Sequence, residues 1–202
     1  MPATLAVLAG TRPECLKLAS LIRAAQAAED LEPVVVSSGQ HLTMVRRTLA
    51  QWSLAPDFEL DRPPTPISLS GTVRWLRDHV RAALRECGAN ALVVQGDTST
   101  AYAGALAARA VGITLIHVEA GLRSRDRSMP EEVNRLVTDA LADLLLTPSD
   151  DADENLRKEG VPDSKIRLVG NVMIDALVTN LPAARRNDLL QRLGIAKKGF
   201  AY

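Results

Sequence analysis

The chain has 202 residues, of which 47% are hydrophobic and 24% are charged, so it is an ordinary globular sequence with room for one domain or for one domain and part of another. Lysine plus arginine and aspartate plus glutamate each number 24, and such a balanced chain has no overall basic field to attract nucleic acid or an anionic membrane. Aromatic residues make up only 3%, which argues against stacking surfaces for single-stranded nucleic acid. We therefore expect neither nucleic acid nor a membrane as a partner.

The cysteines and histidines predict neither a disulfide framework nor a metal site. Cys15 and Cys87 lie far apart and form no CxxC pair, which favours a reducing compartment, and we expect Cys15 to be a buried thiol. The histidines, His41, His79 and His117, have no metal-ligand spacing. The apolar run 1–10 is of strand length and has no basic leader, so we expect a cytoplasmic protein.

Short apolar runs alternate with helical patterns along the chain. The predicted strands are Ala3–Ala9, Pro33–Ser38, Ala91–Gln95, Ile113–Val118, Leu144–Thr147 and Ile166–Val169. The predicted helices cover about 13–28, 40–52, 68–87, 98–111, 130–142 and 151–159. The strands are continuous hydrophobic runs, which is typical of parallel strands covered on both faces. The alternation predicts an α/β fold, a Rossmann-like doubly wound parallel sheet.

The rhythm changes after Gly170. The pattern predicts a first domain over 1–170, followed by a segment, 171–202, that begins with two helical pieces broken at Pro182. Residues 199–202 resemble the opening of another strand. We therefore expect the fold to continue into a second domain, in ancestry if not in this molecule.

The first strand ends at a turn, Gly10–Glu14, that is suited to binding an anion. Pro13 fits the first position of a helix, whose free N–H groups attract negative charge, and Arg12 lies beside them. Lys17 follows one turn later and can reach the same corner. The alternative is a plain strand-to-helix turn with a solvated arginine. The GxGxxG fingerprint of dinucleotide-binding proteins is absent.

Two later strands end in similar polar turns. In Ser38–His41, Gln40 and His41 can hydrogen-bond a sugar or phosphate, or can simply start a helix. Asp97 follows the strand that ends at Gln95, and by itself it is better explained as a helix cap than as a substrate contact.

A carboxylate, Glu119, closes the next apolar run, where it is costly unless it is paired or used. The bland alternative is an ion pair with Arg123. Glu131 also has a bland alternative, since Ser128–Glu131 fits a capping box. On the same helix Arg135 lies four residues after Glu131 and can pair with it.

The positions of these turns in the predicted sheet argue against the purely structural alternatives. The turns near Gly10, Ser38, Gln95 and Glu119 each follow the carboxyl end of a strand. In an open parallel sheet those ends share one edge, where ligands bind. The pattern therefore predicts one cleft that contains anion-binding and acid–base groups.

The ordered motifs resemble those of the non-hydrolysing UDP-N-acetylglucosamine 2-epimerases, which have the two-domain GT-B fold. The matching stretches are GTRPE (10–14) with Lys17, SGQH (38–41), QGDTST (95–100), HVEAGLRS (117–124), MPEEVNR (129–135) and GNVMIDAL (170–177). Together they extend over nearly the whole chain. The resemblance implies that the chain is the N-terminal half of a GT-B fold.

The resemblance also implies a reaction and a set of site residues. The family converts UDP-GlcNAc to UDP-ManNAc by eliminating UDP and adding it back with the opposite configuration at C2, in the biosynthesis of cell-envelope polysaccharides, with no cofactor and no metal. By motif, Asp97, Glu119 and Glu131 match the catalytic carboxylates. The implied substrate-binding residues are Arg12, Lys17, Gln40, His41, Arg123 and Arg135. The motifs do not say which carboxylate is the base, and the full-length enzyme is expected to be a homodimer.

Two departures from the family pattern qualify this expectation. The family often has histidine where Gln95 stands, and its members are about twice as long, with a second domain that supplies most of the nucleotide pocket. We therefore expect half a site and little activity from this chain alone. The alternatives are a non-catalytic half that binds a partner, a hydrolysing 2-epimerase, and an epimerase for a modified UDP-hexosamine.

Overall fold

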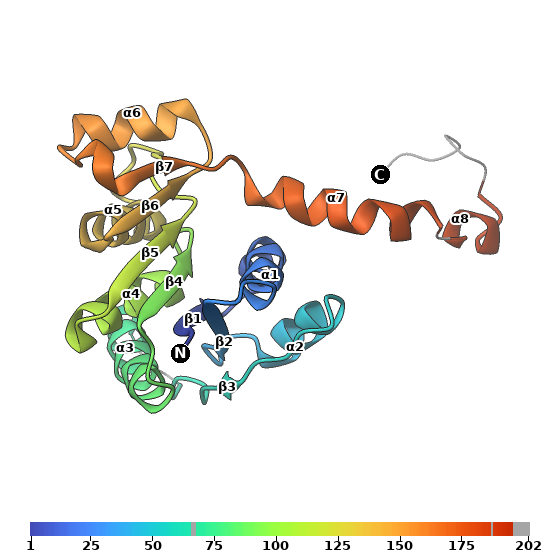
Figure 1. Cartoon of the computed structure of the whole chain (residues 1–202), viewed down its shortest axis with the longest axis horizontal. Helices are drawn as coiled ribbons and strands as arrows, with labels where there is room; N and C mark the ends of the chain where they lie inside the picture. The colour runs from blue at the N-terminus through green and yellow to red at the C-terminus, as the bar shows by residue number, and fades with distance from the viewer. Residues whose placement is uncertain (66–67, 187, 196–202) are drawn as a thin grey trace.

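A computed structural model describes residues 1–65, 68–186 and 188–195, and within them one parallel sheet forms the centre of the molecule (Figure 1). The strand order is β3-β2-β1-β4-β5-β6-β7, and every neighbouring pair is parallel. The strands are β1 (Ala3–Ala9), β2 (Leu31–Ser37), β3 (Phe58–Glu59), β4 (Ala91–Gln95), β5 (Thr114–Val118), β6 (Leu144–Thr147) and β7 (Ile166–Leu168). This order is that of a Rossmann-like doubly wound fold, as predicted.

All six predicted strands are present, with their ends shifted by two residues at most. The short strand β3 was not predicted, because two residues give no hydrophobic period. It pairs with Val36 and Ser37 at the edge of the sheet.

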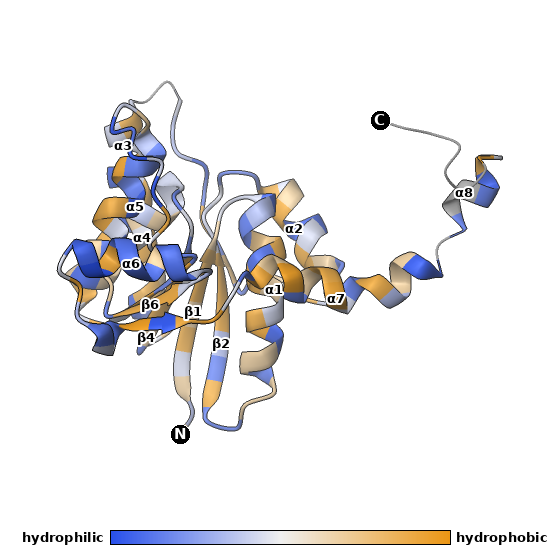
Figure 2. Ribbon diagram, turned by 90° about the horizontal axis from the view of Figure 1, so that it is seen from above, coloured by the Kyte–Doolittle hydropathy of each residue, from blue (hydrophilic) through white to orange (hydrophobic). Residues whose placement is uncertain are grey.

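Helices cover both faces of the sheet. The helices of the described chain are α1 (Arg12–Gln26), α2 (Leu42–Ala50), α3 (Leu69–Glu86), α4 (Ser99–Val111), α5 (Pro130–Leu141), α6 (Asp150–Lys158), α7 (Val172–Arg185) and α8 (Leu189–Arg192), of which α7 and α8 do not cover the sheet. Successive side chains of β1 point to opposite faces of the sheet. Val7 packs in the core that contains residues of α1 and α2, and Leu8 packs in the core that contains residues of α3 and α4. Figure 2 shows the sheet between these two layers.

The face of helix α4 that packs against the sheet is built from alanine and glycine. Ala101, Ala105 and Ala108 are fully buried there. A Cβ atom on Gly104 would lie 2.6 Å from Leu8 Cδ2 and 2.9 Å from Val94 Cγ1, so no larger residue fits without movement. The small side chains therefore bring the start of α4 against the end of β1.

The predicted break at Pro182 is wrong, because α7 continues through this residue to Arg185. Proline removes one helical N–H and crowds the carbonyl four residues earlier. Here α7 is mostly exposed and only Ala176 is buried, so water can hydrate that carbonyl. The predicted strand at 199–202 lies outside the described residues.

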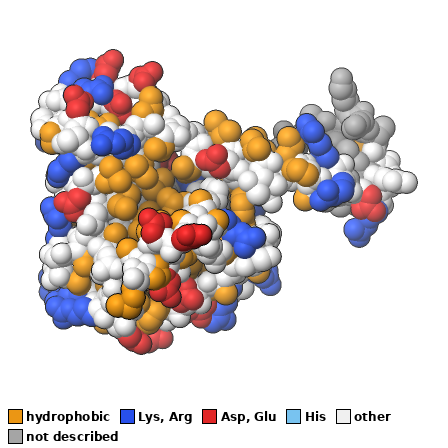
Figure 3. Space-filling view, in the orientation of Figure 1, with side chains coloured by type: hydrophobic (Ala, Val, Ile, Leu, Met, Phe, Trp, Pro, Cys, Tyr) orange, Lys and Arg blue, Asp and Glu red, His pale blue; other side chains and the backbone are white. Residues whose placement is uncertain are grey.

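Helix α7 contacts α1 and then extends away from the body of the molecule (Figure 1). Its hydrophobic side chains are largely exposed, at 58% for Ile174, 62% for Leu177 and 61% for Val178. Figure 3 shows hydrophobic side chains along this arm. Within the described ranges, none of the helices combines the length and the apolar character that crossing a membrane requires.

Candidate functional site

A cleft of about 580 Å³ opens at the carboxyl ends of β1 and β4. The strand order reverses between these two strands, which is where open α/β sheets bind ligands. The N-termini of α1 and α4 both border the cleft and favour anions there. The cleft is lined by Thr11, Arg12, Pro13, Glu14, Lys17, His41, Met44, Gln95, Gly96, Asp97, Thr98, Glu119 and Arg135.

The prediction that polar turns meet at one edge of the sheet is confirmed. Six of the nine predicted site residues line this one cleft, namely Arg12, Lys17, His41, Asp97, Glu119 and Arg135. They come from segments as far apart as α1 and α5 in the sequence.

Lys17 and Glu119 form an ion pair across the cleft. Gln95 donates a second hydrogen bond to the same carboxylate oxygen, at 2.8 Å. Glu119 has a φ of 66°, a left-handed conformation that is uncommon for a residue other than glycine and is often found at functional sites. The bland alternative for Glu119, a pair with Arg123, is wrong.

Asp97 is held by the helix on the other side of the cleft. Arg135 of α5 forms an ion pair with its carboxylate at 2.8 Å, and Asn134 Nδ2 donates to its backbone carbonyl at 2.9 Å. Asp97 does not cap α4, because Thr98 occupies the capping position and its hydroxyl accepts from the Ala101 N–H. The carboxylate of Asp97 therefore remains directed at the cleft.

Arg135 retains one unused donor. Its side chain is 11% exposed, and its Nε is buried with no hydrogen-bond partner among the residues that the structure describes. A buried guanidinium N–H without a partner is costly unless a ligand or water accepts from it.

Glu14 is a buried carboxylate that the sequence reading did not single out. Its Oε2 accepts hydrogen bonds from the N–H groups of Gly10 and Thr11 at 2.9 and 2.7 Å, and Oε1 accepts one from the Thr98 hydroxyl at 2.7 Å. Burial raises the pKa of Glu14, and these hydrogen bonds only partly oppose the rise. The spacing Thr11-x-x-Glu14 is a capping-box signal that would have identified this residue.

Gly10 is needed here for space. A Cβ atom at this position would lie 2.2 Å from Ser38 Oγ and 2.5 Å from Thr100 Oγ1. Those two hydroxyls are 3.0 Å apart, and the Thr100 hydroxyl also donates to Gln40 Oε1 at 3.2 Å. Gln40 thus lies beside the cleft without lining it, while its neighbour His41 does line it.

Arg123 and Glu131 lie outside the cleft. The Arg123 side chain is only 4% exposed and forms ion pairs with Asp139 and Glu159 at 2.8 and 2.6 Å. Burial alone would lower the pKa of Arg123, but the hydrogen bonds to Glu159 and the charge of Asp139 raise it.

Glu131 is exposed in the first turn of α5 and makes no hydrogen bond or ion pair with the described residues. It does not form the predicted capping box. The next residue, Glu132, accepts from the backbone N–H groups of Ser124 and Arg125 at 2.9 and 3.0 Å. Burial opposes its ionisation, but these hydrogen bonds outweigh burial and lower the pKa of Glu132.

Cys15 lies on the buried face of α1, and no part of it is exposed. Burial, together with the charge of neighbouring Glu14, raises the pKa of this thiol to about 12. The prediction of a buried thiol is therefore confirmed. Among the described residues, no three histidine, cysteine or carboxylate side chains are placed to hold a metal ion.

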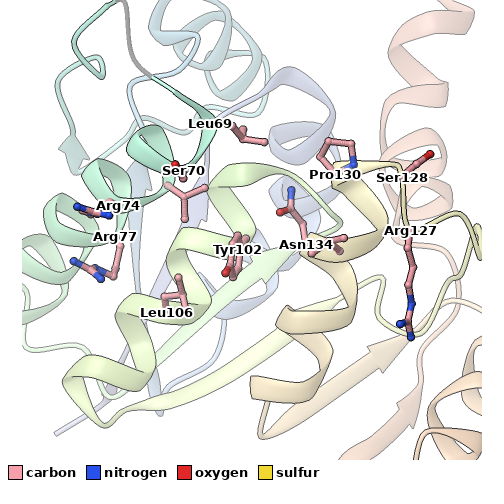
Figure 4. Close-up of a pocket in the computed structure, with 12 residues that line it drawn as sticks. Leu69, Ser70, Arg74, Arg77, Tyr102, Leu106, Arg127, Ser128, Pro130 and Asn134 are labelled. Carbon is pink, nitrogen blue, oxygen red and sulfur yellow. The ribbon is translucent and has the colours of Figure 1, made fainter.

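A second hollow of about 520 Å³ lies between α3, α4 and α5 (Figure 4). Its lining is largely apolar, with Tyr102 and Leu106 in the middle. Arg74 and Arg77 point away from Arg127, so the arginines do not converge on one point. It contains no carboxylate and none of the predicted site residues, so it does not suit acid–base chemistry.

Comparison with known proteins shows which family the chain resembles. A sequence model described as UDP-N-acetylglucosamine 2-epimerase matches residues 23–201. The chain is 36% identical over 190 residues to a UDP-N-acetylglucosamine 2-epimerase of Methanocaldococcus jannaschii, which covers 91% of this chain and 50% of the relative. It is 34% identical over 184 residues to the Salmonella typhimurium enzyme of the same name, covering 90% of this chain and 49% of the relative.

Solved structures agree with the sequence relatives. The UDP-GlcNAc 2-epimerase of Neisseria meningitidis, bound to UDP-GlcNAc, superposes with a TM-score of 0.87 at 30% identity and covers 94% of this chain and 52% of that one. The M. jannaschii enzyme with UDP-GlcNAc and UDP gives 0.85 at 34% identity, with the same coverage. MurG of Acinetobacter baumannii, at 13% identity and a TM-score of 0.59, shares only the fold, which is of the GT-B type.

The chain thus spans about half the length of the relatives and structures that it matches. The family model covers most of the chain, from residue 23 to residue 201. The α/β fold class, with the sheet of one half of a GT-B protein, is confirmed. The chain belongs to the UDP-N-acetylglucosamine 2-epimerase family.

Proposed function

We propose that the cleft is the acid–base half of a UDP-GlcNAc 2-epimerase site. The observation that carries this proposal is the presence of two cation–carboxylate pairs, Lys17–Glu119 and Arg135–Asp97, in one cleft where the strand order reverses. Epimerisation at C2 requires groups that remove and return a proton, and cations that accept a departing diphosphate. The cleft contains both kinds of group.

The proposed reaction leaves the composition of the sugar nucleotide unchanged. A carboxylate takes the proton from C2, the bond between C1 and the diphosphate oxygen breaks, and UDP leaves with the electron pair. A protonated group then returns a proton to C2 from the opposite face while UDP adds back to C1. The product is UDP-ManNAc, with no change in oxidation state and no cofactor.

Roles follow from position. Arg12, Lys17 and Arg135, with the N-terminus of α1, are proposed to hold the diphosphate, because they carry the positive charge of the cleft. Asp97 and Glu119 are proposed to transfer protons, since both carboxylates line the cleft.

The remaining predicted residues have supporting places in this proposal. Gln40 and His41 are proposed to contact the sugar or phosphate from β2's end of the cleft. Glu131 is proposed as the third carboxylate, and it must move inward from its exposed place on α5 to act. Arg123 would have to leave Asp139 and Glu159 to reach substrate.

UDP binding to the 202-residue chain tests the site directly. On titration with UDP, the backbone amide signals of Gly10, Arg12, Lys17 and Asp97 in a ¹H–¹⁵N spectrum should shift together with one weak affinity. Uridine, which lacks phosphate, is the matched control and should shift them little. Shifts confined to the hollow between α3 and α5 would contradict the proposal.

Turnover is a separate question. We propose that the chain alone forms no appreciable UDP-ManNAc from UDP-GlcNAc, because it aligns with only half of each relative. An assay of the purified chain for UDP-ManNAc checks this, and robust turnover would contradict it.

The finer assignments are also proposals. We propose that residues 1–170 form one domain, that 171–202 lead into a second domain, and that the whole protein is a cytoplasmic homodimer that serves cell-envelope polysaccharide synthesis without binding nucleic acid. The exposed apolar side chains of α7 support a protein partner for that segment. The balanced charge of the chain supports the exclusion of nucleic acid.

A further inference from the structure

His117 lies fully buried directly beneath the cleft, at the end of β5. Both ring nitrogens have partners: Nε2 is 2.8 Å from the Gly96 carbonyl oxygen, and Nδ1 is 2.6 Å from Asp139 Oδ1. Asp139 belongs to α5, and Gly96 to the turn after β4. The ring therefore connects a strand, a turn and a helix that all contribute to the cleft.

The hydrogen-bond partners determine where the protons are. A backbone carbonyl can only accept, so Nε2 of His117 carries a proton. Asp139 Oδ2 accepts from the Gly121 N–H at 3.1 Å and from the Arg123 guanidinium at 2.8 Å, which is the pattern of an ionised carboxylate. An ionised carboxylate also can only accept, so Nδ1 carries a proton as well.

The charged groups near the ring are Asp139, Arg123 and Glu159. Asp139 is buried between the His117 ring and Arg123, and Arg123 also pairs with Glu159, whose side chain is 37% exposed. Burial by itself would raise the pKa of Asp139, but its bonds to His117 and Arg123 outweigh burial and lower it.

This network fixes both turns that carry the proposed proton-transfer groups. Gly96 immediately precedes Asp97, and its N–H donates to the Val118 carbonyl at 3.0 Å. Glu119 follows His117 by two residues in a left-handed conformation, and the turn after it is held through the Gly121 N–H.

We propose that His117 is an imidazolium that links the Gly96 turn to α5 and so acts as a positioning residue for Asp97 and Glu119. The positioning role rests on the proposed function of the cleft, whereas the charge on the ring does not. His117 itself does not line the cleft, so its effect on a ligand is indirect.

The first experiment reads the charge without any ligand. In the 202-residue chain with ¹⁵N-labelled histidine, the two ring nitrogens of His117 should both show the shift and one-bond proton coupling of protonated nitrogen at neutral pH. His41 and His79 provide internal references, and His117→Asn identifies the signal. A single protonated nitrogen on His117 would overturn the assignment of charge.

The second experiment separates the two bonds of the ring with matched variants. In His117→Gln the amide nitrogen occupies the place of Nε2 and can still donate to the Gly96 carbonyl. In His117→Asn it occupies the place of Nδ1 and can still donate to Asp139 while the Gly96 link is lost. Both variants lose the charge, so they should be similarly destabilised in urea.

The positioning role predicts different effects at the cleft. His117→Asn should move the backbone amide signals of Asp97 and weaken UDP binding by about tenfold, the equivalent of one charge-assisted hydrogen bond, while His117→Gln should keep both near the unsubstituted chain. Equal effects of the two variants, in proportion to lost stability, would overturn the positioning role. If UDP does not bind at all, the proposed function of the cleft fails, and the Asp97 signals still test the link.

Discussion

Replacing Glu14 by alanine should destabilise the fold far more than the loss of an ordinary carboxylate. The side chain is 1% exposed and accepts hydrogen bonds from two backbone N–H groups and the Thr11 and Thr98 hydroxyls. In Glu14→Ala the N–H groups of Gly10 and Thr11 lose their acceptor at the end of β1. This turn also forms the wall of the cleft.

The magnitude follows from those orphaned donors. Each buried N–H left without a partner costs about 1–3 kcal/mol. For the two donors together the cost is about 2–6 kcal/mol. Burial raises the pKa of Glu14 and so already opposes its charged form, which places the expected loss in the lower half of that range, at about 3 kcal/mol. That is a large part of the roughly 5–15 kcal/mol that stabilises a typical domain. With a urea dependence of about 2 kcal/mol/M, the midpoint should fall by about 1.5 M.

Urea denaturation followed by circular dichroism measures this loss. Glu14→Gln is the matched variant, because its amide oxygen can still accept from Gly10 and Thr11 while its NH2 group faces the Thr98 hydroxyl, which can accept. Glu29→Ala, at an exposed glutamate, controls for removal of charge and should change little. A loss below about 1 kcal/mol in Glu14→Ala, or equal losses for alanine and glutamine, would refute the reasoning.

The pH dependence of the same pair of proteins has a definite sign. A raised folded-state pKa means that the folded chain binds the Glu14 proton more tightly than the unfolded chain, whose value is near 4.5. The contribution of Glu14 to the free energy of unfolding therefore falls as pH rises above that value. Glutamine does not titrate, so Glu14→Gln should gain stability relative to the unsubstituted chain as pH rises above about 4.5.

Three further predictions concern the cleft, its backbone and its buried thiol. Lys17→Gln should weaken UDP binding by about tenfold, since a charge-assisted contact is lost, while Arg23→Gln at the other end of α1 should leave the affinity unchanged in the same titration. Gly121→Ala should lower the free energy of unfolding by about 3 kcal/mol, because φ is 81° and the new Cβ would lie 2.5 Å from the Ala152 carbonyl oxygen. Gly160→Ala, at a φ of 85° in open space, should cost only about 1 kcal/mol, and equal losses would contradict the clash. Cys15 should react with a thiol reagent only as fast as the chain unfolds, so rapid labelling of the folded chain would contradict its burial.

Much of the fold could be predicted because buried parallel strands are continuous apolar runs, as in Ala3–Ala9 and Leu144–Thr147, whose bounds match. The two-residue strand Phe58–Glu59 has no such run, and its pairing depends on where β2 ends. The course of α7 through Pro182 depends on exposure, which a local pattern does not contain.

The site could be predicted as a place but not as a set of contacts. The shared edge of the sheet follows from the alternation of strands and helices, and it brings Lys17, Asp97 and Glu119 together. Which cation faces which carboxylate depends on side-chain direction. Arg123, only four residues after Glu119, binds partners on α5 and at the end of α6 instead. One hydrogen-bond partner of Glu14, the Thr98 hydroxyl, lies 84 residues away in the sequence.

The packing of small residues of α4 against the sheet has a consequence for how the cleft could change during evolution. The absence of a side chain at Gly104 and the small side chains of the neighbouring alanines allow the start of α4, with Thr98 and Thr100, to lie beside Gly10. A methyl group added at Gly104 would lie 2.6 Å from Leu8 Cδ2 and 2.9 Å from Val94 Cγ1, so either these side chains or the helix would have to shift. A substitution on the buried face of α4 that shifts the helix would also shift Thr98 in the cleft lining, so residues that never touch a ligand can alter the shape of the cleft.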